Sequence, residues 1–234
     1  MNGNNLYLSD MNYQVIDYNR SCQSDADTSK SADSIKAYDW FNYMNYLSGY
    51  DKVINYSWKN SGISKRERKE IKKIFREIDE VTGITFQKTK KKNDDLRFIS
   101  VKEIDDTTRL EIDEQINPFP VEDIVVGRAS ARNNRIKIFW RDDDKQVSYL
   151  EKYVLRHEIG HALGLAHPDG DGSNPDWNVS DTIMSYNVWA GSGVFTYYGF
   201  TDLDKQALGE LWNPQPTDNF LPPKDIVENI TIPV

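Results

Sequence analysis

Residues 157–167 read HEIGHALGLAH and contain all three histidines of the chain. His157 and His161 are four residues apart, so on a helix they project from one face about one turn apart, and two imidazole nitrogens can reach one metal ion. His167 lies six residues beyond His161 and cannot share that face. We therefore expect the chain to turn at Gly164, where a left-handed backbone costs little, and to bring His167 to the same metal ion.

The chemistry of this segment indicates a catalytic zinc site. Three neutral imidazoles hold zinc and leave a fourth position for water, whereas structural zinc sites are normally closed by four protein ligands. Glu158 is not needed as a ligand and is long enough to act as general base on the metal-bound water. A lone HExxH occurs by chance on many helices, but the full HExxHxxGxxH pattern arises by accident in on the order of one in 10⁵ chains of this size.

The composition is that of a globular protein and excludes several other classes. With 234 residues, 38% of them apolar and 28% charged, the chain can bury one core, and we expect one main domain with tails. The formal net charge of −8 would repel a phosphate backbone, so neither nucleic acid nor anionic lipid is an expected partner. The single cysteine, Cys22, excludes an internal disulfide and a thiolate zinc cluster.

The ends of the sequence differ from its middle. Residues 1–35 are polar and rich in Asn, Asp and Ser, which predicts a leader or pro-segment, and residues 214–234 form a proline-rich tail. The main domain is expected over residues 36–213. The start lacks the basic and apolar regions of a Sec signal, and no stretch approaches the roughly 20 apolar residues of a membrane span. We expect no membrane partner.

Three helices are predicted to begin at capping boxes, formed by Ser64 with Glu67, Ser148 with Glu151, and Thr201 with Asp204. The first has an apolar face that repeats at helical spacing until Gly83. The second runs into the histidine segment and should end at Gly164, and the third should reach Trp212.

Alternation and β-branching predict strands at 53–58, 84–89, 96–101, 125–132 and 135–140, the last two joined as a hairpin by Asn133 and Asn134. Gly127 and the arginines of the first hairpin strand suit the edge of a sheet. The dense aromatic residues between Tyr38 and Tyr50 are predicted to be core.

The motif, with a methionine turn downstream, resembles the signature of the metzincin zinc peptidases. Within that clan the chain is most similar to the serralysin family, because Pro168 follows the third histidine and Met184 is followed by Ser185 and Tyr186. Residues 47–58, LSGYDKVINYSW, also resemble that family's entry into its first catalytic-domain strand. The resemblance covers roughly residues 36–213.

The resemblance implies a role for each residue that matches the motif. His157, His161 and His167 would bind zinc, and Glu158 would be the catalytic base. Met184 would form the hydrophobic floor beneath the metal. Tyr186 would be a further zinc ligand at rest that swings away to stabilise the oxyanion. The alternative for Tyr186 is an ordinary buried tyrosine with a satisfied hydroxyl.

Calcium and export are less well supported by the residues. Serralysins usually continue into glycine- and aspartate-rich calcium-binding repeats and a C-terminal export signal, and the sequence to Val234 contains neither, although the resemblance implies secretion without a Sec signal. Asp169, Asp171 and Asp176 could bind calcium, but they follow no defined ligand pattern, so we favour a solvated loop. Cys22 could imitate a zinc-blocking propeptide cysteine, but its surroundings, SCQSD, favour a free thiol.

The resulting hypothesis is an α+β metzincin fold. It has a twisted, mostly parallel sheet with an antiparallel edge strand, a backing helix, the active-site helix, and a small C-terminal subdomain after Gly164, with a cleft between the two parts. The expected function is that of a monomeric zinc-dependent endopeptidase, whose edge strand at Gly127, Arg128 and Ala129 binds an extended peptide by strand addition.

A rival hypothesis is a non-catalytic peptide-binding or inhibitory module with a structural zinc. The intact Glu158 and the lack of a fourth strong protein ligand argue against it, because structural zinc sites are normally closed.

Overall fold

The computed structural model describes residues 30–58, 62–90, 94–101, 127–131, 134–142, 147–187 and 199–213. Cys22 and the proline-rich tail lie outside the described residues, as does Asn133 of the predicted hairpin turn. No helix in the described part of the chain is long and apolar enough to cross a membrane.

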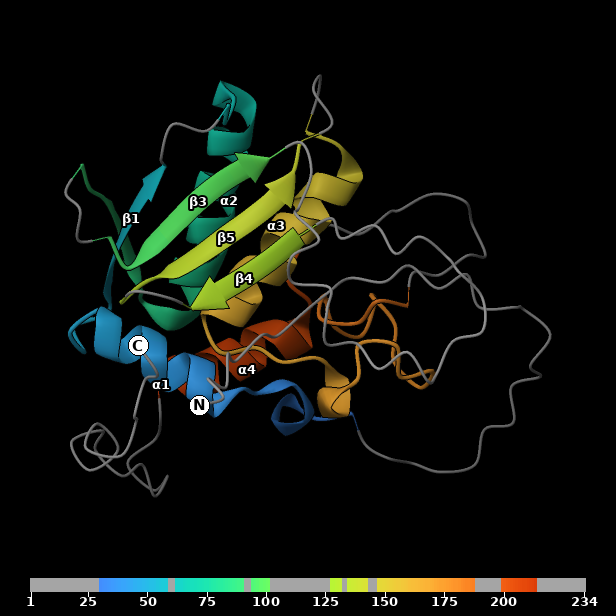
Figure 1. Ribbon diagram of the computed structural model, residues 1–234. Coiled ribbons are helices and arrows are strands. Elements are labelled where there is room, and N and C mark those ends of the chain that lie inside the picture. Colours follow the sequence, from blue (N-terminus) through green and yellow to red (C-terminus); the bar gives the residue numbers. More distant parts are fainter. Residues whose placement is uncertain are drawn as a thin grey trace, which may run out of the picture.

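The described strands form one twisted five-stranded sheet (Figure 1). Its members are β1 (Val53–Trp58), β2 (Thr85–Lys88), β3 (Leu96–Val101), β4 (Gly127–Ala131) and β5 (Ile136–Arg141). The order is β2-β1-β3-β5-β4, with every neighbouring pair parallel except the antiparallel pair of β4 and β5. The predicted mixed sheet with an antiparallel edge is therefore confirmed, and so is the α+β class.

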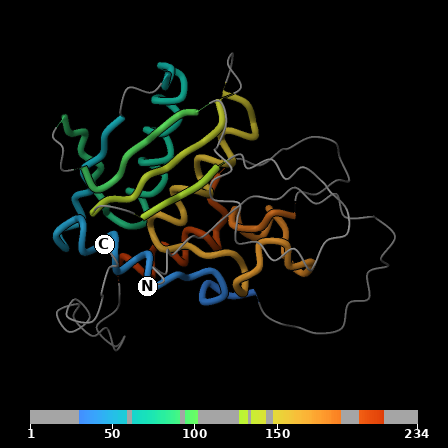
Figure 2. Tube along the Cα trace, viewed as in Figure 1, coloured from blue at the N-terminus to red at the C-terminus, as the bar shows by residue number. Residues whose placement is uncertain are grey.

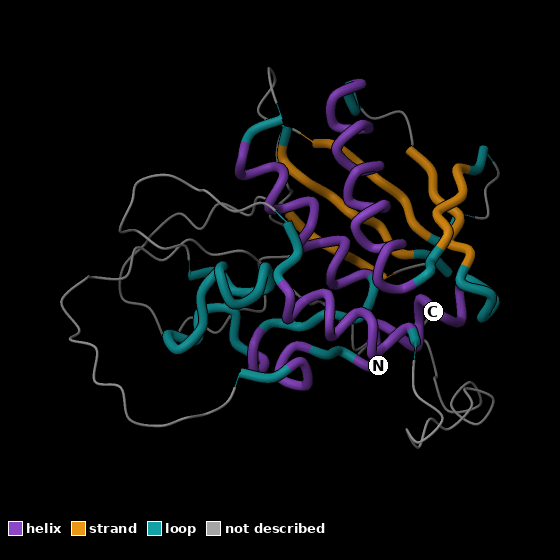
Figure 3. The backbone as a smooth tube through the Cα atoms, turned by 180° about the vertical axis from the view of Figure 1, so that it is seen from behind, coloured by secondary structure: helices purple, strands orange, loops and turns teal. Residues whose placement is uncertain are grey.

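Two helices cover one face of this sheet. Figure 1 shows α2 (Lys65–Thr82) and α3 (Tyr149–Ala162) behind the strands, and from the opposite side, in Figure 3, they lie in front of them. Alternate residues of the strands point into this layer, and Phe75 of α2 stacks on Phe86 and lies edge-on to Tyr56. The apolar face of α2 and the alternation of the strands were the two patterns that predicted this core.

The helix boundaries follow the predicted caps. At both Ser64 and Ser148 the hydroxyl accepts from the backbone N–H three residues on, and the glutamate at that position accepts from the serine N–H. The third helix, α4 (Asp202–Trp212), begins in the same way at Thr201. Gly83 follows α2 with φ 68°, as its role as a C-terminal stop requires.

A buried arginine fixes α3 against α2. Arg156 donates two hydrogen bonds to the carboxylate of Glu77, at 2.9 and 3.1 Å, and a third to Glu70 at 2.9 Å. Its side chain is 1% exposed, so the two carboxylates supply the pairing that a buried guanidinium needs. The helix that bears the histidines is therefore anchored one residue before His157.

The first described residues pack beneath the sheet, beside the last helix (Figure 2). They form the 3-10 turn η1 (Ala32–Ile35), in which Ala32 and Ile35 are buried, so the packed region extends into the segment predicted as a polar leader. Helix α1 (Tyr38–Leu47) follows, and its Phe41 lies edge-on to Trp212 at 5.1 Å.

The aromatic stretch from Tyr38 to Tyr50 was predicted to be core, and this is only partly correct. Trp40 and Phe41 are buried, but Tyr38, Tyr46 and Tyr50 are 44–53% exposed. The stretch forms a helix with one face on the domain, which aromatic density alone did not indicate.

The chain reverses at Gly164, as predicted. Gly164 has φ 105°, and a β carbon there would lie 2.7 Å from Cβ of Phe41 and 3.1 Å from Cδ1 of Leu211. Its carbonyl accepts from the N–H of Ala37 at 2.7 Å. Both the backbone conformation and the close packing of α1 and α4 therefore require glycine.

We expect Gly164→Ala to cost more stability than a positive φ alone explains. Gly83 is the matched control, since its φ is 68° but nothing lies within 4 Å of its missing β carbon. Gly83→Ala should lower the free energy of unfolding by about 1–2 kcal/mol, and Gly164→Ala by about 3 kcal/mol or more because packed atoms must also move. Urea denaturation measures both, and equal losses would contradict the packing argument.

Candidate metal centre

Three imidazole nitrogens converge at the end of α3. Nε2 of His161 lies 3.0 Å from Nε2 of His157 and 3.2 Å from Nε2 of His167, and the remaining pair is 3.3 Å apart. His157 and His161 come from consecutive turns of the helix, and His167 arrives after the reversal at Gly164. The structure therefore brings together the three histidines as the sequence predicted.

The outer nitrogens of two rings are fixed by backbone carbonyls. Nδ1 of His157 lies 2.8 Å from the carbonyl oxygen of Ile183, and Nδ1 of His161 lies 2.9 Å from that of Leu165. A carbonyl can only accept, so each Nδ1 carries the proton and each Nε2 presents its lone pair to the common centre.

This arrangement fits zinc. Tetrahedral zinc with Zn–N bonds of about 2.0–2.1 Å separates its ligand nitrogens by about 3.3 Å, close to the observed spacing. Burial lowers the pKa of His157 and of His161 well below the ordinary value, with a smaller contribution from a neighbouring imidazole in each case. The same two causes lower the pKa of His167 to about 3. The rings are therefore held neutral, as metal ligands must be.

Glu158 lies against the edge strand. It is fully buried, and a β carbon on Gly127 would lie 2.9 Å from its Oε1 and 2.3 Å from Cγ1 of Val154. Only glycine lets β4 approach α3 this closely. Gly127 thus joins the predicted base to the predicted substrate strand, in which Gly127 and Ala129 are buried and Arg128 is half-buried.

Met184 and Tyr186 reach the site from the segment after the loop. Met184 is fully buried, and a β carbon on Gly160, between the two helical histidines, would lie 3.0 Å from its Sδ. The hydroxyl of Tyr186 lies 2.7 Å from Nε2 of His167, the nitrogen that faces the common centre. The Tyr186 ring also packs over Gly172, where a β carbon would be 2.5 Å from the ring.

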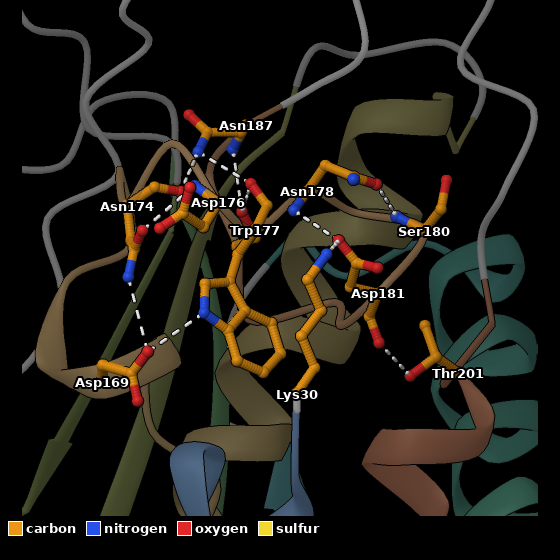
Figure 4. A network of polar contacts seen from close by, with 11 residues as sticks. Lys30, Asp169, Asn174, Asp176, Trp177, Asn178, Ser180, Asp181, Asn187 and Thr201 are labelled. Carbon is orange, nitrogen blue, oxygen red and sulfur yellow. Dashed lines mark hydrogen bonds and ion pairs between the residues drawn. The ribbon is translucent and has the colours of Figure 1, made fainter. Parts of the chain in front are cut away.

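The loop that joins His167 to this segment is held by polar side chains of the loop and of neighbouring segments (Figure 4). Asp169 accepts from the indole N–H of Trp177 at 3.0 Å, and the amide of Asn187 donates to the carbonyls of Asn174 and Trp177 at 2.6 and 2.9 Å. Asp171 accepts from a backbone N–H within the loop. The bonds of Asn187 connect the loop to the segment that carries Tyr186.

Among the described residues, two groups of three side chains converge closely enough to hold a metal ion. One is the histidine triad, and the other is Glu67, Asp142 and Glu151. In the second group Glu67 already accepts from the indole of Trp140 and both glutamates complete capping boxes. Nitrogen ligands also suit zinc better than an all-carboxylate set, so the triad is the zinc candidate.

The sequence missed the residues that hold the segment of Met184. Asp204 was recognised only as a helix cap, but its carboxylate also accepts from the Thr182 hydroxyl and the Ile183 N–H. Tyr153, one turn before His157, donates from its hydroxyl to the carbonyl of Ser185. These contacts span 21–32 residues, and no local pattern signals them.

A protein-family model described as Matrixin (Peptidase_M10) matches residues 50–174, which is more than half of the chain. The chain belongs to the matrixin family. This matrixin is therefore, in general terms, a zinc metalloendopeptidase of the metzincin fold, and its substrates are proteins or peptides. The matched region includes the triad and Glu158 and ends before Met184 and Tyr186.

Comparison with solved structures found similarity to myroilysin, at 17% sequence identity and a TM-score of 0.39. The match covers 70% of this matrixin and 93% of the myroilysin chain. The comparison with curated proteins found no match.

We expect metal-free protein to take up one zinc ion per chain at the triad. His161→Gln should abolish tight zinc binding, because only two imidazoles remain. Glu151→Gln, which changes the carboxylate group, should leave zinc binding intact. Competition with a chromophoric chelator measures both. Zinc binding that is lost only in Glu151→Gln would place the ion at the carboxylates.

Proposed function

We propose that this matrixin hydrolyses internal peptide bonds of extended protein or peptide substrates, with zinc held by His157, His161 and His167. The observation that carries the proposal is the convergence of three imidazole nitrogens, each 3.0–3.3 Å from the other two. Zinc held there supplies Lewis acidity, which makes water nucleophilic at neutral pH and polarises a carbonyl.

Glu158 is the proposed general base and acid. Its place on α3 directly after a ligand and its burial beside the edge strand support this role. The carboxylate takes a proton from the attacking water and then gives a proton to the amide nitrogen that leaves. Burial excludes bulk water, which would otherwise weaken the interaction of the carboxylate with the reacting groups.

The edge strand β4 is the proposed substrate platform. It is the last strand in the order of the described sheet, so it lies at an edge of that sheet. An extended peptide can add to Gly127, Arg128 and Ala129 by main-chain hydrogen bonds. Gly127 supports this placement, because its close contact with Glu158 brings the added strand next to the base.

Tyr186 is the proposed oxyanion donor, as in the serralysins, which the Met-Ser-Tyr sequence resembles. Support comes from its hydroxyl, 2.7 Å from the metal-facing nitrogen of His167. At rest this hydroxyl would hold zinc together with the three imidazoles. During the reaction the ring moves and the hydroxyl donates to the oxygen that gains negative charge. Met184 supplies an apolar floor beneath the triad.

A non-catalytic module with a structural zinc is the rival to this function. It would bind peptides and zinc without cleaving any peptide, so a chelator-sensitive digest of a peptide mixture separates the two hypotheses. The set of three imidazoles argues for an open, catalytic coordination sphere.

Glu158→Gln should lower kcat/KM by about 10²–10⁴-fold, because the amide cannot accept the proton of water. The zinc content should stay at the wild-type value, since Glu158 is not a ligand. Glu80→Gln is the control, because it makes the same chemical change at an exposed position on α2. Fluorogenic peptide cleavage is the assay, and wild-type turnover by Glu158→Gln would refute the assigned role.

Tyr186→Phe should lower kcat by roughly 10- to 1,000-fold with little change in KM, because the hydroxyl acts mainly in the transition state. The three histidines remain, so zinc content should hold. Tyr56→Phe is the control, because it removes the hydroxyl of a buried tyrosine on β1 that lies outside the proposed site. Equal kcat values for Tyr186→Phe and wild type would make Tyr186 a packing residue.

A further inference from the structure

One zinc ligand is connected to a buried carboxylate by a continuous chain of hydrogen bonds. Nδ1–H of His157 donates to the carbonyl of Ile183 at 2.8 Å. The N–H of that same peptide group belongs to Met184 and donates to the hydroxyl oxygen of Thr182 at 3.1 Å. The Thr182 hydroxyl in turn donates to Oδ1 of Asp204 at 2.5 Å.

We propose that Asp204 is a positioning residue that strengthens His157 as a zinc ligand, and that it acts through Thr182 and the peptide group after Ile183. This inference rests on the zinc site proposed above. It gives Asp204 a function besides the capping of α4.

Every bond in the chain points the same way, from the imidazole towards the carboxylate. A carboxylate is a strong acceptor, so it polarises the Thr182 hydroxyl and makes its oxygen a better acceptor for the next N–H. Bonds aligned in this way strengthen one another, and they do so most in a low-dielectric interior. Thr182 and Asp204 are both 0% exposed, so water does not screen the chain.

The effect at the far end is on the metal-binding nitrogen. A stronger acceptor at Nδ1–H draws that proton outwards and leaves more electron density on Nε2, which makes the ring a better ligand and fixes its orientation. Oδ2 of Asp204 also accepts from the N–H of Ile183 at 3.0 Å and of Thr201 at 2.8 Å, so the carboxylate is held in place.

His161 provides an internal comparison. Its Nδ1–H donates to the carbonyl of Leu165, and the N–H of that peptide group, on Ala166, donates to the carbonyl of Ile35 at 2.8 Å. Both of these bonds end on neutral backbone carbonyls, whereas the chain from His157 ends on a carboxylate. The two helical ligands are therefore supported unequally.

Thr182→Val tests the chain while leaving Asp204 as the cap of α4. Valine has the shape of threonine but carries a methyl group in place of the hydroxyl, whereas Thr182→Ser keeps the hydroxyl. Thr82 offers a matched control, because it is equally buried, donates to the carbonyl of Ile78 and accepts from the N–H of Ile84 at 3.1 Å. Thr82→Val therefore removes a hydroxyl of the same kind at the end of α2.

Zinc affinity is measured at pH 8, which favours the carboxylate, by competition with a chelator. Thr182→Val and Asp204→Asn should each raise the zinc Kd by about 10- to 100-fold, whereas Thr82→Val and Thr182→Ser should bind like the wild type. Equal Kd values for Thr182→Val and Thr82→Val would overturn the proposal. If Thr182→Val does not fold, an unchanged Kd in Asp204→Asn overturns it instead.

Nitrogen-edited NMR of the zinc-loaded protein measures the chemical shift of each Nδ1–H proton, which distinguishes this chain of bonds from a general effect on stability. In Thr182→Val the Nδ1–H proton of His157 should shift upfield, as its hydrogen bond weakens, while that of His161 stays unchanged. Equal shifts at both rings would indicate general loosening and refute the chain. Wild-type protein that takes up no zinc would instead refute the metal site itself, so the two failures are distinguishable.

Discussion

The three imidazole nitrogens of the triad lie 3.0–3.3 Å apart, and the rest of the structure has to keep them uncharged and in place. Charged rings at this separation would repel one another strongly in a medium of low dielectric, so all three must be neutral. Burial lowers their pKa values, and carbonyl acceptors fix two of the three protons on the outer nitrogens. The three Nε2 lone pairs thus point to one centre, where a divalent cation can bind them.

Rigid elements maintain this geometry from two directions. Helix α3 carries two ligands and is tied to α2 by Arg156, while the reversal at Gly164 brings the third ligand back towards it. Helix α4 holds the segment of Met184 from the other side through Asp204. The site therefore depends on the packing between helices that are far apart in the sequence, and a local motif alone does not position it.

The sequence predicted the features that are set by local chemistry. The caps at Ser64, Ser148 and Thr201 are formed within three residues, so the sequence was sufficient to locate them. The histidine spacing was sufficient for the same reason, because helical periodicity fixes which side chains meet. By contrast, which face of α1 is buried depends on where the rest of the domain packs against the helix. The residues next to Tyr46 in the sequence therefore do not indicate that its side chain is exposed.

Glycine shows the limit of sequence reasoning most clearly, because one residue type meets two different requirements. Gly164 was predicted from the motif, since a chain reversal needs a positive φ. Gly127 and Gly172 serve close approach instead, one against Glu158 and the other against the ring of Tyr186. Their partners are 31 and 14 residues away, so the need for a missing β carbon appears only when two surfaces meet. Because Gly127 has no side chain, the edge strand can lie against the base. Because Gly172 has none, the ring of Tyr186 can take its place beside the triad.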